Sequence, residues 1–516
     1  MKFSSLLALV LAALLSLLTG CSDVVQPDPP LGPAFNHAAA GGAALFVDRN
    51  STAEREDGTA SAPFRTITRA LDHARRLRFG SSAAGVSPSV NTIIVHIAPS
   101  AAPYVGSFDP AVFDAASPLY DPSKEMLPLM LNIPRLDLRG GTRLLEDADG
   151  LPSTVVPETV TMLRADQPQG GRQYLVMVTR TNPVPGSEFP ESLEMAGDDV
   201  TITGLWLEAD PAPQIPSAFI GVDAVTDFVV RGNVLASGAN GIFTRLASGR
   251  IEGNLALNNV VAFFLTGGSS RLPGILTVRG NRVTGQRAAG GGLYLMGAGE
   301  TGNRRRDLDF GANRFRRVML PAVYDPLASP GEVPDKLQVD VIHNEFSNSQ
   351  NGVRVVGYVQ DPYSAAPGQD ETANIRASFR DNVVSSNQHY GLVADAAQIP
   401  LGDRRRVSMD LSFAGTTMDG NGFGPAIFTF WRYAGSISLG SPTPFLQPNP
   451  VFAHDSTIRI CGDVTVFHYD NRQDPHPPTN PAPTNNRLLV NNVELDGFQV
   501  SAFFEVPATS PRCGSP

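Results

Sequence analysis

Cysteine and lysine are scarce in this sequence, and the overall charge is negative. Three cysteines occur in 516 residues, and neither Cys461 nor Cys513 has the closely spaced Cys or His partners that a zinc site needs. Lysine occurs three times among the 40 basic residues, so arginine carries almost all of the positive charge. The formal net charge of −10 argues against a nucleic-acid ligand and against general attraction to polyanions, while leaving room for a local basic groove.

Long apolar runs, paired tryptophans and helical periodicity are scarce as well. After the run Leu6–Leu18, no segment is long and apolar enough to cross a membrane as a helix. The two tryptophans, Trp206 and Trp431, are too far apart in sequence to indicate a sugar-stacking platform. The middle of the chain lacks a helical period, which argues against an α-solenoid.

The N-terminus has the pattern of an export signal. Lys2 precedes the apolar run Leu6–Leu18, which is of signal-peptide length, and Leu18-Thr19-Gly20-Cys21 follows. This tetrapeptide resembles the lipobox of bacterial lipoproteins. The resemblance implies cleavage between Gly20 and Cys21 and a diacylglycerol on Cys21. By the same resemblance, Ser22 after the cysteine favours transfer of the protein to the outer membrane over retention in the inner membrane, if the host has two membranes. The alternative is an ordinary secretory signal with a chance cysteine.

The chain is expected to contain four segments. We expect a signal peptide over 1–20, a Pro-rich tether over 21–42, a main body over 43–424, and irregular final strands with a cap over 425–516. The 49 glycines and 43 prolines are typical of many short strands separated by turns. Because an exported protein meets an oxidising compartment, Cys461 and Cys513 are expected to form a disulfide, the alternative being two unpaired thiols.

The body begins with a strand at Leu45–Asp48, a Gly-Thr loop, and a helix whose apolar residues fall on one stripe from Ile67 to Leu77. Thr66 is a plausible N-cap, and a strand follows at Thr92–Ile97. This order resembles the start of right-handed parallel β-helix proteins of the pectate-lyase-like superfamily. In that family the helix plugs the open end of the coil, where apolar core and strand edges would otherwise be exposed.

A weak repeat from residue 200 onward supports the same fold independently. Each unit has alternating apolar residues, an Asn, and a Gly about eight residues later that we expect to form the next corner. The left-handed turn conformation is assigned to the Asn, which could also form an amide ladder through the stack. The expected turn residues are Asn233, Asn254, Asn281, Asn313, Asn344 and Asn382. The sequence therefore predicts an all-β parallel solenoid, with a β-sandwich array as the alternative.

Known catalytic patterns of β-helix enzymes do not assemble in the sequence, and the catalytic residues are unknown. Asp223 and Asp227 are close together but have only Arg231 nearby, and Asp198-Asp199 is a weak signal by itself. Asp474-Pro475-His476 only echoes an alginate-epimerase motif. His343 and His389 are isolated and are interpreted as turn residues.

One charged set remains: Arg231, Glu252 and Arg279 each stand two residues before a turn Asn, with Arg380 further along. If the register holds, they form a ladder of alternating charge. One interpretation is a groove that binds sugar carboxylates through arginine; the favoured one is a surface salt-bridge ladder.

These observations favour a lipid-anchored cell-envelope protein that binds a glycan or a protein partner without catalysis. The alternative is a polysaccharide lyase or glycoside hydrolase that acts on an acidic polysaccharide. No cofactor or metal is expected, and Ca²⁺ belongs only to the lyase alternative. The expected partners are the membrane, through the lipid, and a polysaccharide or an envelope protein, with no nucleic acid. The sequence does not indicate on which side of the membrane the protein lies.

Overall fold

The structure is a computed structural model that divides the chain into two units, Met1–Ala40 and Gly41–Pro516. The described residues all belong to the second unit. They are 42–80, 92–166, 174–209, 218–266, 275–286, 291–298, 315–317, 336–359, 371–398, 405–424, 427–433, 457–462, 465–470, 487–491, 493–494 and 502–505. None of the helices in these ranges is long and apolar enough to cross a membrane. The expected signal peptide, Cys21 and the tether lie outside the described residues.

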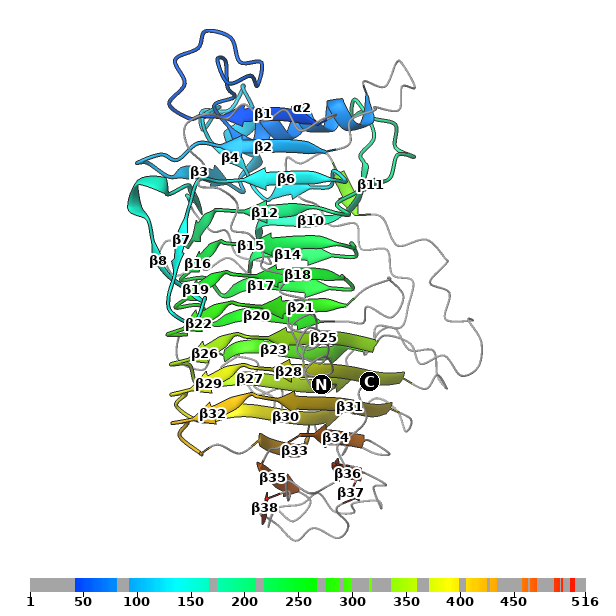
Figure 1. The fold of residues 1–516 in the computed structure, drawn as a ribbon. Coiled ribbons are helices and arrows are strands. Elements are labelled where there is room, and N and C mark those ends of the chain that lie inside the picture. The colour runs from blue at the N-terminus through cyan, green and yellow to red at the C-terminus, as the bar shows by residue number, and fades with distance from the viewer. Residues whose placement is uncertain are drawn as a thin grey trace, which may run out of the picture. The chain divides into compact units, whose positions relative to one another are not determined.

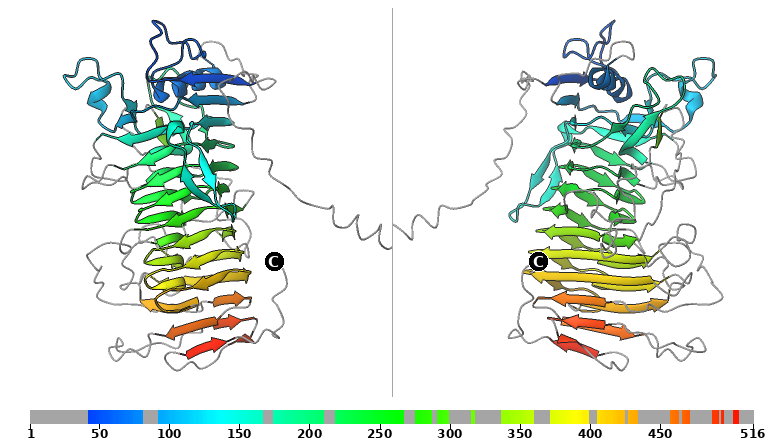
Figure 2. Two further views of the ribbon diagram at one scale, coloured as in Figure 1. Left: turned by 60° about the vertical axis from the view of Figure 1, so that its left-hand side comes forward. Right: turned by 90° about the vertical axis from the view of Figure 1, so that its right-hand side faces the viewer.

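The second unit is a parallel β-helix, as predicted (Figures 1 and 2). Its strands build three long sheets, and in the central part of the coil each rung adds one strand to each sheet in turn. Sheet I contains β1 (Ala43–Val47), β2 (Ile93–Ile97), β6 (Leu136–Arg139), β12 (Thr201–Thr203), β15 (Phe228–Arg231), β18 (Gly249–Glu252), β21 (Leu276–Arg279), β25 (Lys336–Ile342), β28 (Glu371–Arg380), β31 (Arg405–Ala414), β34 (Thr457–Cys461), β36 (Arg487–Val490) and β37 (Val493–Glu494).

Sheets II and III complete the central rungs. Sheet II contains β5 (Leu129–Leu131), β10 (Tyr174–Pro183), β11 (Met195–Ala196), β14 (Ala218–Asp223), β17 (Asn240–Arg245), β20 (Val261–Thr266), β23 (Gly291–Ala298), β24 (Phe315–Arg317), β27 (Asn351–Val359), β30 (Tyr390–Gln398), β33 (Ile427–Tyr433), β35 (Thr465–Asp470) and β38 (Ala502–Glu505). Sheet III contains β3 (Tyr104–Ser107), β4 (Glu125–Met126), β9 (Met162–Ala165), β13 (Trp206–Glu208), β16 (Val234–Ala236), β19 (Leu255–Leu257), β22 (Arg282–Thr284), β26 (Glu345–Ser347), β29 (Val383–Ser385) and β32 (Thr417–Asp419). A separate hairpin pairs β7 (Leu144–Glu146) with β8 (Pro152–Val155), and two short 3-10 helices cover Pro110–Phe113 and Pro157–Thr159.

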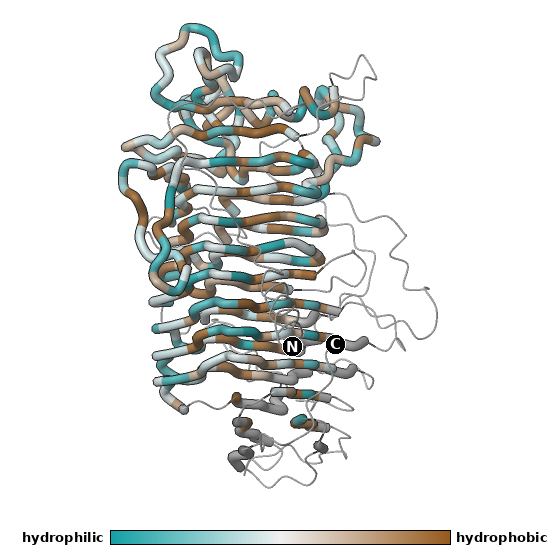
Figure 3. The backbone as a smooth tube through the Cα atoms, viewed as in Figure 1, coloured by the Kyte–Doolittle hydropathy of each residue, from teal (hydrophilic) through white to brown (hydrophobic). Residues whose placement is uncertain are grey.

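The core lies inside the coil because side chains alternate between its inner and outer faces. Val230, Ile251 and Val278 are Cα partners on successive rungs of sheet I, and all three are fully buried. Figure 3 shows the resulting alternation of apolar and polar positions along the strands. Burying one such side chain contributes about 1.5–3 kcal/mol, so the stack of apolar columns is the main stabilising feature of the fold.

The N-terminal end of the coil carries the expected helix, α2 (Ile67–Phe79). Thr66 caps it by accepting a hydrogen bond from the Arg69 backbone N–H, as the sequence predicted. Ile67, Leu71 and Ala74 are buried in the same core cluster as the first strands. The apolar stripe of α2 therefore packs on the first rungs.

Two turns recur on each rung with the same construction. The first connects sheet I to sheet III, and the second connects sheet III to sheet II. In each, a residue with positive φ precedes a polar ladder residue, for example Gly253 (φ 61°) before Asn254 and Asn258 (φ 54°) before Asn259. The expectation that the ladder Asn itself is left-handed was therefore wrong: the preceding residue reverses the chain, and this leaves the Asn amide free to bond between rungs.

The asparagine ladder at the first turn is continuous over five rungs. Each amide donates to the side-chain oxygen of the next Asn at 2.9–3.1 Å, in the order Asn233, Asn254, Asn281, Asn344 and Asn382. The expected position of Asn313 was wrong, because β21 pairs directly with β25 and leaves no rung between Asn281 and Asn344. Asn313 itself lies outside the described residues.

A second polar ladder, at the second turn, was missed. It lies five residues after the first ladder and contains Asn259, Gln286, Ser349, Asn387 and Asn421, among which Asn387 donates to Asn421 at 2.9 Å. The column was not recognised in the sequence because its positions are occupied by different residue types.

The repeat glycines have a different role from the one expected. Gly241, Gly292, Gly352 and Gly391 lie within strands and have no positive φ. A Cβ on Gly352 would lie 2.4 Å from a methyl carbon of Val384. The missing side chain therefore permits close packing and does not form a corner.

Candidate binding surface on sheet I

The outer face of sheet I contains the charged ladder predicted from the sequence. Arg231 is the Cα partner of Glu252, and Glu252 is the Cα partner of Arg279, so the register prediction is confirmed. Arg380 occupies the same column, but Ile342 separates it from Arg279. All four predicted residues therefore lie in one line across the strands.

More arginines lie on this face than the sequence indicated. Among the outward positions of sheet I whose side chains the structure describes, seven are arginines and four are carboxylates, namely Arg139, Arg231, Arg250, Arg279, Arg376, Arg380 and Arg459 with Asp137, Glu252, Asp340 and Asp410. The face is thus locally basic on a chain whose net charge is −10. A long insertion between β21 and β25 hid the register from sequence inspection.

Ion pairing on this face is partial. Asp137 pairs with Arg139 at 2.5 Å, whereas Arg250–Glu252 (4.0 Å), Arg376–Asp410 (3.7 Å) and Arg380–Asp340 (3.8 Å) are long.

Arg279 is exposed, and among the described residues no carboxylate pairs with it. Glu252 lies 4.0 Å from Arg250 on its own strand. The continuous salt-bridge ladder favoured from the sequence is therefore not formed along this column. The Arg279 guanidinium can therefore donate two parallel hydrogen bonds to an external carboxylate.

Two carboxylates singled out in the sequence are engaged by arginine. Asp223 is buried and accepts from Arg245 at 2.9 and 3.0 Å. Burial raises the pKa of Asp223, and the charge of Arg245 opposes that rise. Asp198 accepts from Arg180 at 2.5 Å and from the backbone N–H of Thr226 at 2.8 Å. Both aspartates have evident structural roles.

Asp199 has a different environment. Burial, and next the charge of Asp227, raise the pKa of Asp199, while Arg135 opposes the rise. Arg135, Asp199 and Asp227 each lie two residues before a set of Cα partners in sheet I and have φ near 57–58°, so they form one column of left-handed residues. Both aspartates are exposed, so the raised pKa of Asp199 is the one property of a general acid that this place shows.

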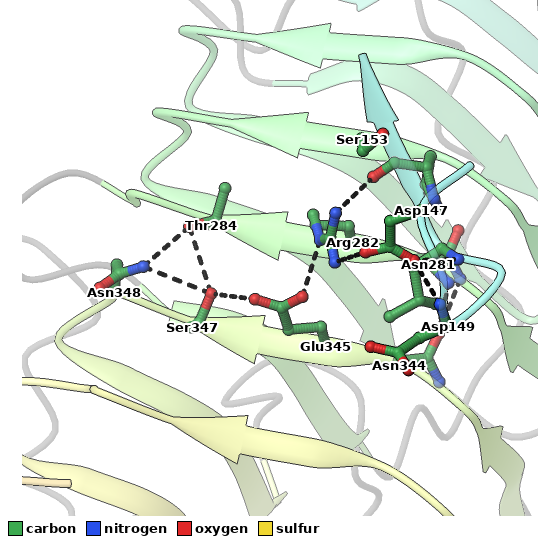
Figure 4. Close-up of polar contacts among 12 residues, drawn as sticks. Asp147, Asp149, Ser153, Asn281, Arg282, Thr284, Asn344, Glu345, Ser347 and Asn348 are labelled. Atoms are coloured by element: carbon green, nitrogen blue, oxygen red, sulfur yellow. Dashed lines mark hydrogen bonds and ion pairs between the residues drawn. The ribbon is translucent and has the colours of Figure 1, made fainter. Parts of the chain in front are cut away.

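A convergence of opposite charges holds the β7–β8 hairpin against sheet III (Figure 4). Arg282 donates to Glu345 at 2.7 Å and also to Asp147 at the hairpin tip. His343 bonds through Nε2 to the backbone oxygen of Asp149 at 2.7 Å. The hydrogen bond from Arg282 lowers the pKa of Asp147, so this carboxyl stays ionised and cannot act as a proton donor near neutral pH. We call this group the hairpin clasp.

The outer face of sheet II carries an aromatic column. Phe243 and Phe264 are Cα partners whose rings stack with centroids 5.7 Å apart, and Tyr294 follows at 6.0 Å. The guanidinium of Arg354 lies 5.8 Å from the Tyr294 ring centroid. The first pair of rings is stacked and the second is tilted, and each pair stabilises the neighbouring rungs by about 0.5–1.5 kcal/mol.

The remaining sequence candidates are dispersed. The His389 ring lies 5.7 Å from the Phe423 ring, and Trp206 lies on the outer face of sheet III. Cys461 is disulfide-bonded, while its expected partner Cys513 lies outside the described residues. So do Asp474-Pro475-His476 and the side chain of Trp431. Within the described ranges no group of three or more His, Cys, Asp or Glu residues could hold a metal ion.

Comparison with known proteins gives remote structural likenesses only. No protein-family model and no curated protein matches the sequence. The mannuronan C-5 epimerase A-module of Azotobacter vinelandii is similar at 11% identity with a TM-score of 0.32, covering 77% of this chain and 85% of that one. DFA-IIIase from Arthrobacter chlorophenolicus A6 is similar at 9% identity with a TM-score of 0.27, covering 81% and 94%. Neither likeness carries an argument about activity.

Proposed function

We propose that this chain is a lipid-anchored cell-envelope protein whose β-helix binds an acidic glycan, without catalysis, on the outer face of sheet I. The observation that carries the proposal is the excess of arginine over carboxylate on that face of an acidic protein. Arginine is the side chain best suited to sugar carboxylates because its planar fork binds both oxygens. The rest of the acidic surface would keep nonspecific polyanion binding low.

Binding to polygalacturonate and to its methyl ester tests this function. We expect the purified protein to bind the free acid and not the ester, with an affinity that falls as salt increases. Arg279→Ala should weaken binding, whereas Arg143→Ala should not, because Arg143 is exposed but lies outside sheet I. Equal binding of acid and ester, or an equal loss in both variants, would contradict the proposal.

The anchor rests on the lipobox-like Leu18-Thr19-Gly20-Cys21 and has a separate test. Cells that express the chain are labelled with a radioactive fatty acid, and we expect label in the native protein and in Ser22→Ala but none in Cys21→Ala. Label that persists in Cys21→Ala would refute lipidation at this residue.

The alternative is a polysaccharide lyase or hydrolase, and the raised pKa of Asp199 next to Asp227 favours it. Hydrolysis of a glycosidic bond commonly uses two carboxyl groups of unequal pKa. New reducing ends or unsaturated products from acidic polysaccharides, lost in Asp199→Asn, would establish the enzyme and overturn the non-catalytic proposal.

A further inference from the structure

The β7–β8 hairpin lies over one column of outward positions on sheet III (Figures 1 and 4). From β13 to β22, the Cα partners in this column are Trp206, Val234, Leu255 and Arg282. The base of the hairpin, where Thr161 bonds to Thr142, accepts a hydrogen bond from the Trp206 backbone N–H at 2.8 Å. The tip is bound to Arg282 by the hairpin clasp. The hairpin therefore spans the rungs between, and we call Trp206, Val234 and Leu255 the covered strip.

The length of the hairpin matches this span. Neighbouring parallel strands lie about 4.8 Å apart, so the three steps from β13 to β22 cover about 14 Å. The four extended steps from Arg143 to Asp147 also cover about 14 Å. Asp147 thus reaches Arg282 when the hairpin lies flat along the axis of the coil.

Exposure along the column changes where the hairpin ends. Val234 and Leu255 point outward, yet their exposed fractions are 0 and 4%. Beyond the tip, the same column continues to Val383, which is 42% exposed, and to Thr417, which is exposed as well. The apolar part of this column is therefore shielded as far as the hairpin reaches.

The hairpin is not part of the coil itself. β7 and β8 pair with each other, and among the described residues no backbone-to-backbone hydrogen bond joins residues 144–155 to sheet III. A two-stranded hairpin by itself is marginally stable in water. Because apolar contact and the side-chain bonds of the clasp hold it, the hairpin can lift away without breaking a rung.

The covered strip contains one polar group that the closed hairpin leaves unsatisfied. The indole N–H of Trp206 is buried and has no hydrogen-bond partner among the described residues. A buried donor without an acceptor costs free energy. The closed arrangement is therefore not the one in which this strip is best satisfied, and a backbone carbonyl of an incoming segment would supply the acceptor.

We infer that the covered strip is a docking site for an extended segment of a partner protein with an acidic residue at one end, and that the hairpin is its built-in competitor. The bound hairpin specifies the chemistry of this segment. Apolar side chains would lie on Val234 and Leu255, and a carboxylate would replace Asp147 on Arg282. A fatty acid would supply the carboxylate and the apolar contact, but no acceptor for the indole of Trp206. The site is separate from sheet I, so the two proposals stand or fall independently.

Two variants that release the same hairpin tip separate docking from simple opening. The probe is a fluorescent synthetic peptide of residues 143–156, the sequence of the hairpin itself, and anisotropy measures its binding. Asp147→Asn removes the competing charge and keeps Arg282, whereas Arg282→Ala removes the cation. We expect the peptide to bind Asp147→Asn about tenfold more tightly than native protein, because more of that variant is open. Arg282→Ala should bind it no better than native protein does. Equal binding to the two variants would overturn the inference.

A variant without the hairpin tests the strip directly. The Val156 backbone N–H donates to the Arg143 oxygen at 3.0 Å, so the two ends lie side by side and a short Gly-Ser linker can replace residues 144–155. We expect this variant to bind the peptide most tightly, and to lose that binding when Arg282→Ala or Trp206→Phe is added. No saturable binding to this variant, or binding that survives both substitutions, would overturn the inference.

The oligomeric state of the native protein separates a partner from a second copy. Light scattering after size-exclusion chromatography should show a monomer. A dimer that the 143–156 peptide dissociates would identify the hairpin of a second copy as the occupant and would overturn the partner assignment. Circular dichroism of each variant establishes that it is folded.

Discussion

The Asn281 side-chain amide donates a hydrogen bond to the side-chain oxygen of Asn344 at 2.9 Å, although 63 residues separate the two in sequence. The same Asn344 oxygen accepts from the Asn281 backbone N–H at 3.0 Å. Both residues are buried, so each bond satisfies a polar group that water cannot reach. The ladder therefore determines which rungs become neighbours, even where a long insertion separates them.

Replacing Asn281 should test the contribution of the ladder to stability. Asn281→Ala leaves the backbone N–H and the amide of Asn254 without their shared acceptor. An unsatisfied buried group costs about 1–3 kcal/mol, so we expect the free energy of unfolding in urea to fall by roughly 3 kcal/mol. The exposed Asn50→Ala is the control and should change it by less than about 0.5 kcal/mol. Similar values for both variants would show that the ladder adds little.

The sequence predicted the coil, the capping helix and most of the first ladder because these depend on local patterns. Alternation of apolar residues, the stripe from Ile67 to Leu77, and Asn after alternating strands are all visible within a short window. The prediction that Asn313 is a turn residue was wrong because the residues before it have the same apolar pattern as a true rung. Only the strand pairing shows that β25 follows β21 in the sheet.

The site was predictable only in part, for the same reason. Arg231, Glu252 and Arg279 come from consecutive units, so their register could be inferred from the Asn positions. That Arg139 and Arg380 lie in the same column as these residues depends on pairings across long insertions. The contact between Arg282 and Asp147 joins residues 135 apart, and nothing in the local sequence of either residue indicates it.

The left-handed residue before each ladder Asn should be sensitive to side-chain shape. An added Cβ at Gly253 would lie 4.0 Å from the backbone nitrogen of Gly232, an ordinary contact distance, so Gly253→Ala introduces backbone strain and no clash. We expect a loss of about 1 kcal/mol in the free energy of unfolding. Asp381 has φ 53° at the equivalent position, so Asp381→Gly should be nearly neutral. An unchanged stability in Gly253→Ala would contradict the assigned strain.

Glu125 should make the capped end of the coil sensitive to pH. Its carboxylate accepts from the backbone N–H groups of Ile67 and Thr68, both at 2.8 Å, at the start of α2. Burial nevertheless outweighs these hydrogen bonds and raises the pKa of Glu125 to about 7, from an ordinary 4.5.

Because the folded pKa is the higher one, the stabilising effect is complete below pH 4.5 and is lost as the pH rises to about 7. We expect the free energy of unfolding to fall by up to about 3 kcal/mol across this interval. Urea titrations at several pH values measure this change, and Glu125→Gln should remove most of it. A slope that persists unchanged in Glu125→Gln would assign the effect to other groups.

The hairpin clasp should control the local opening of β7 and β8. Removing Arg282 leaves Asp147 and Glu345 without their shared cation, so Arg282→Ala should release the hairpin tip. Hydrogen exchange of residues 144–155 measures this release, and we expect rates to increase about tenfold or more. Arg143→Ala removes an exposed arginine just before β7 and should leave these rates unchanged.

Acid should break the Arg282–Asp147 contact only at low pH. The hydrogen bond from Arg282 lowers the pKa of Asp147 below its ordinary 3.8, so the stabilising effect of the ionised form is present above that value. It is lost only as the pH falls through the lowered folded pKa. Exchange in the hairpin should therefore show no clasp-dependent change between pH 7 and pH 5, once corrected for intrinsic rates. A release already complete at pH 5 would show that the Arg282–Asp147 pair does not hold the hairpin.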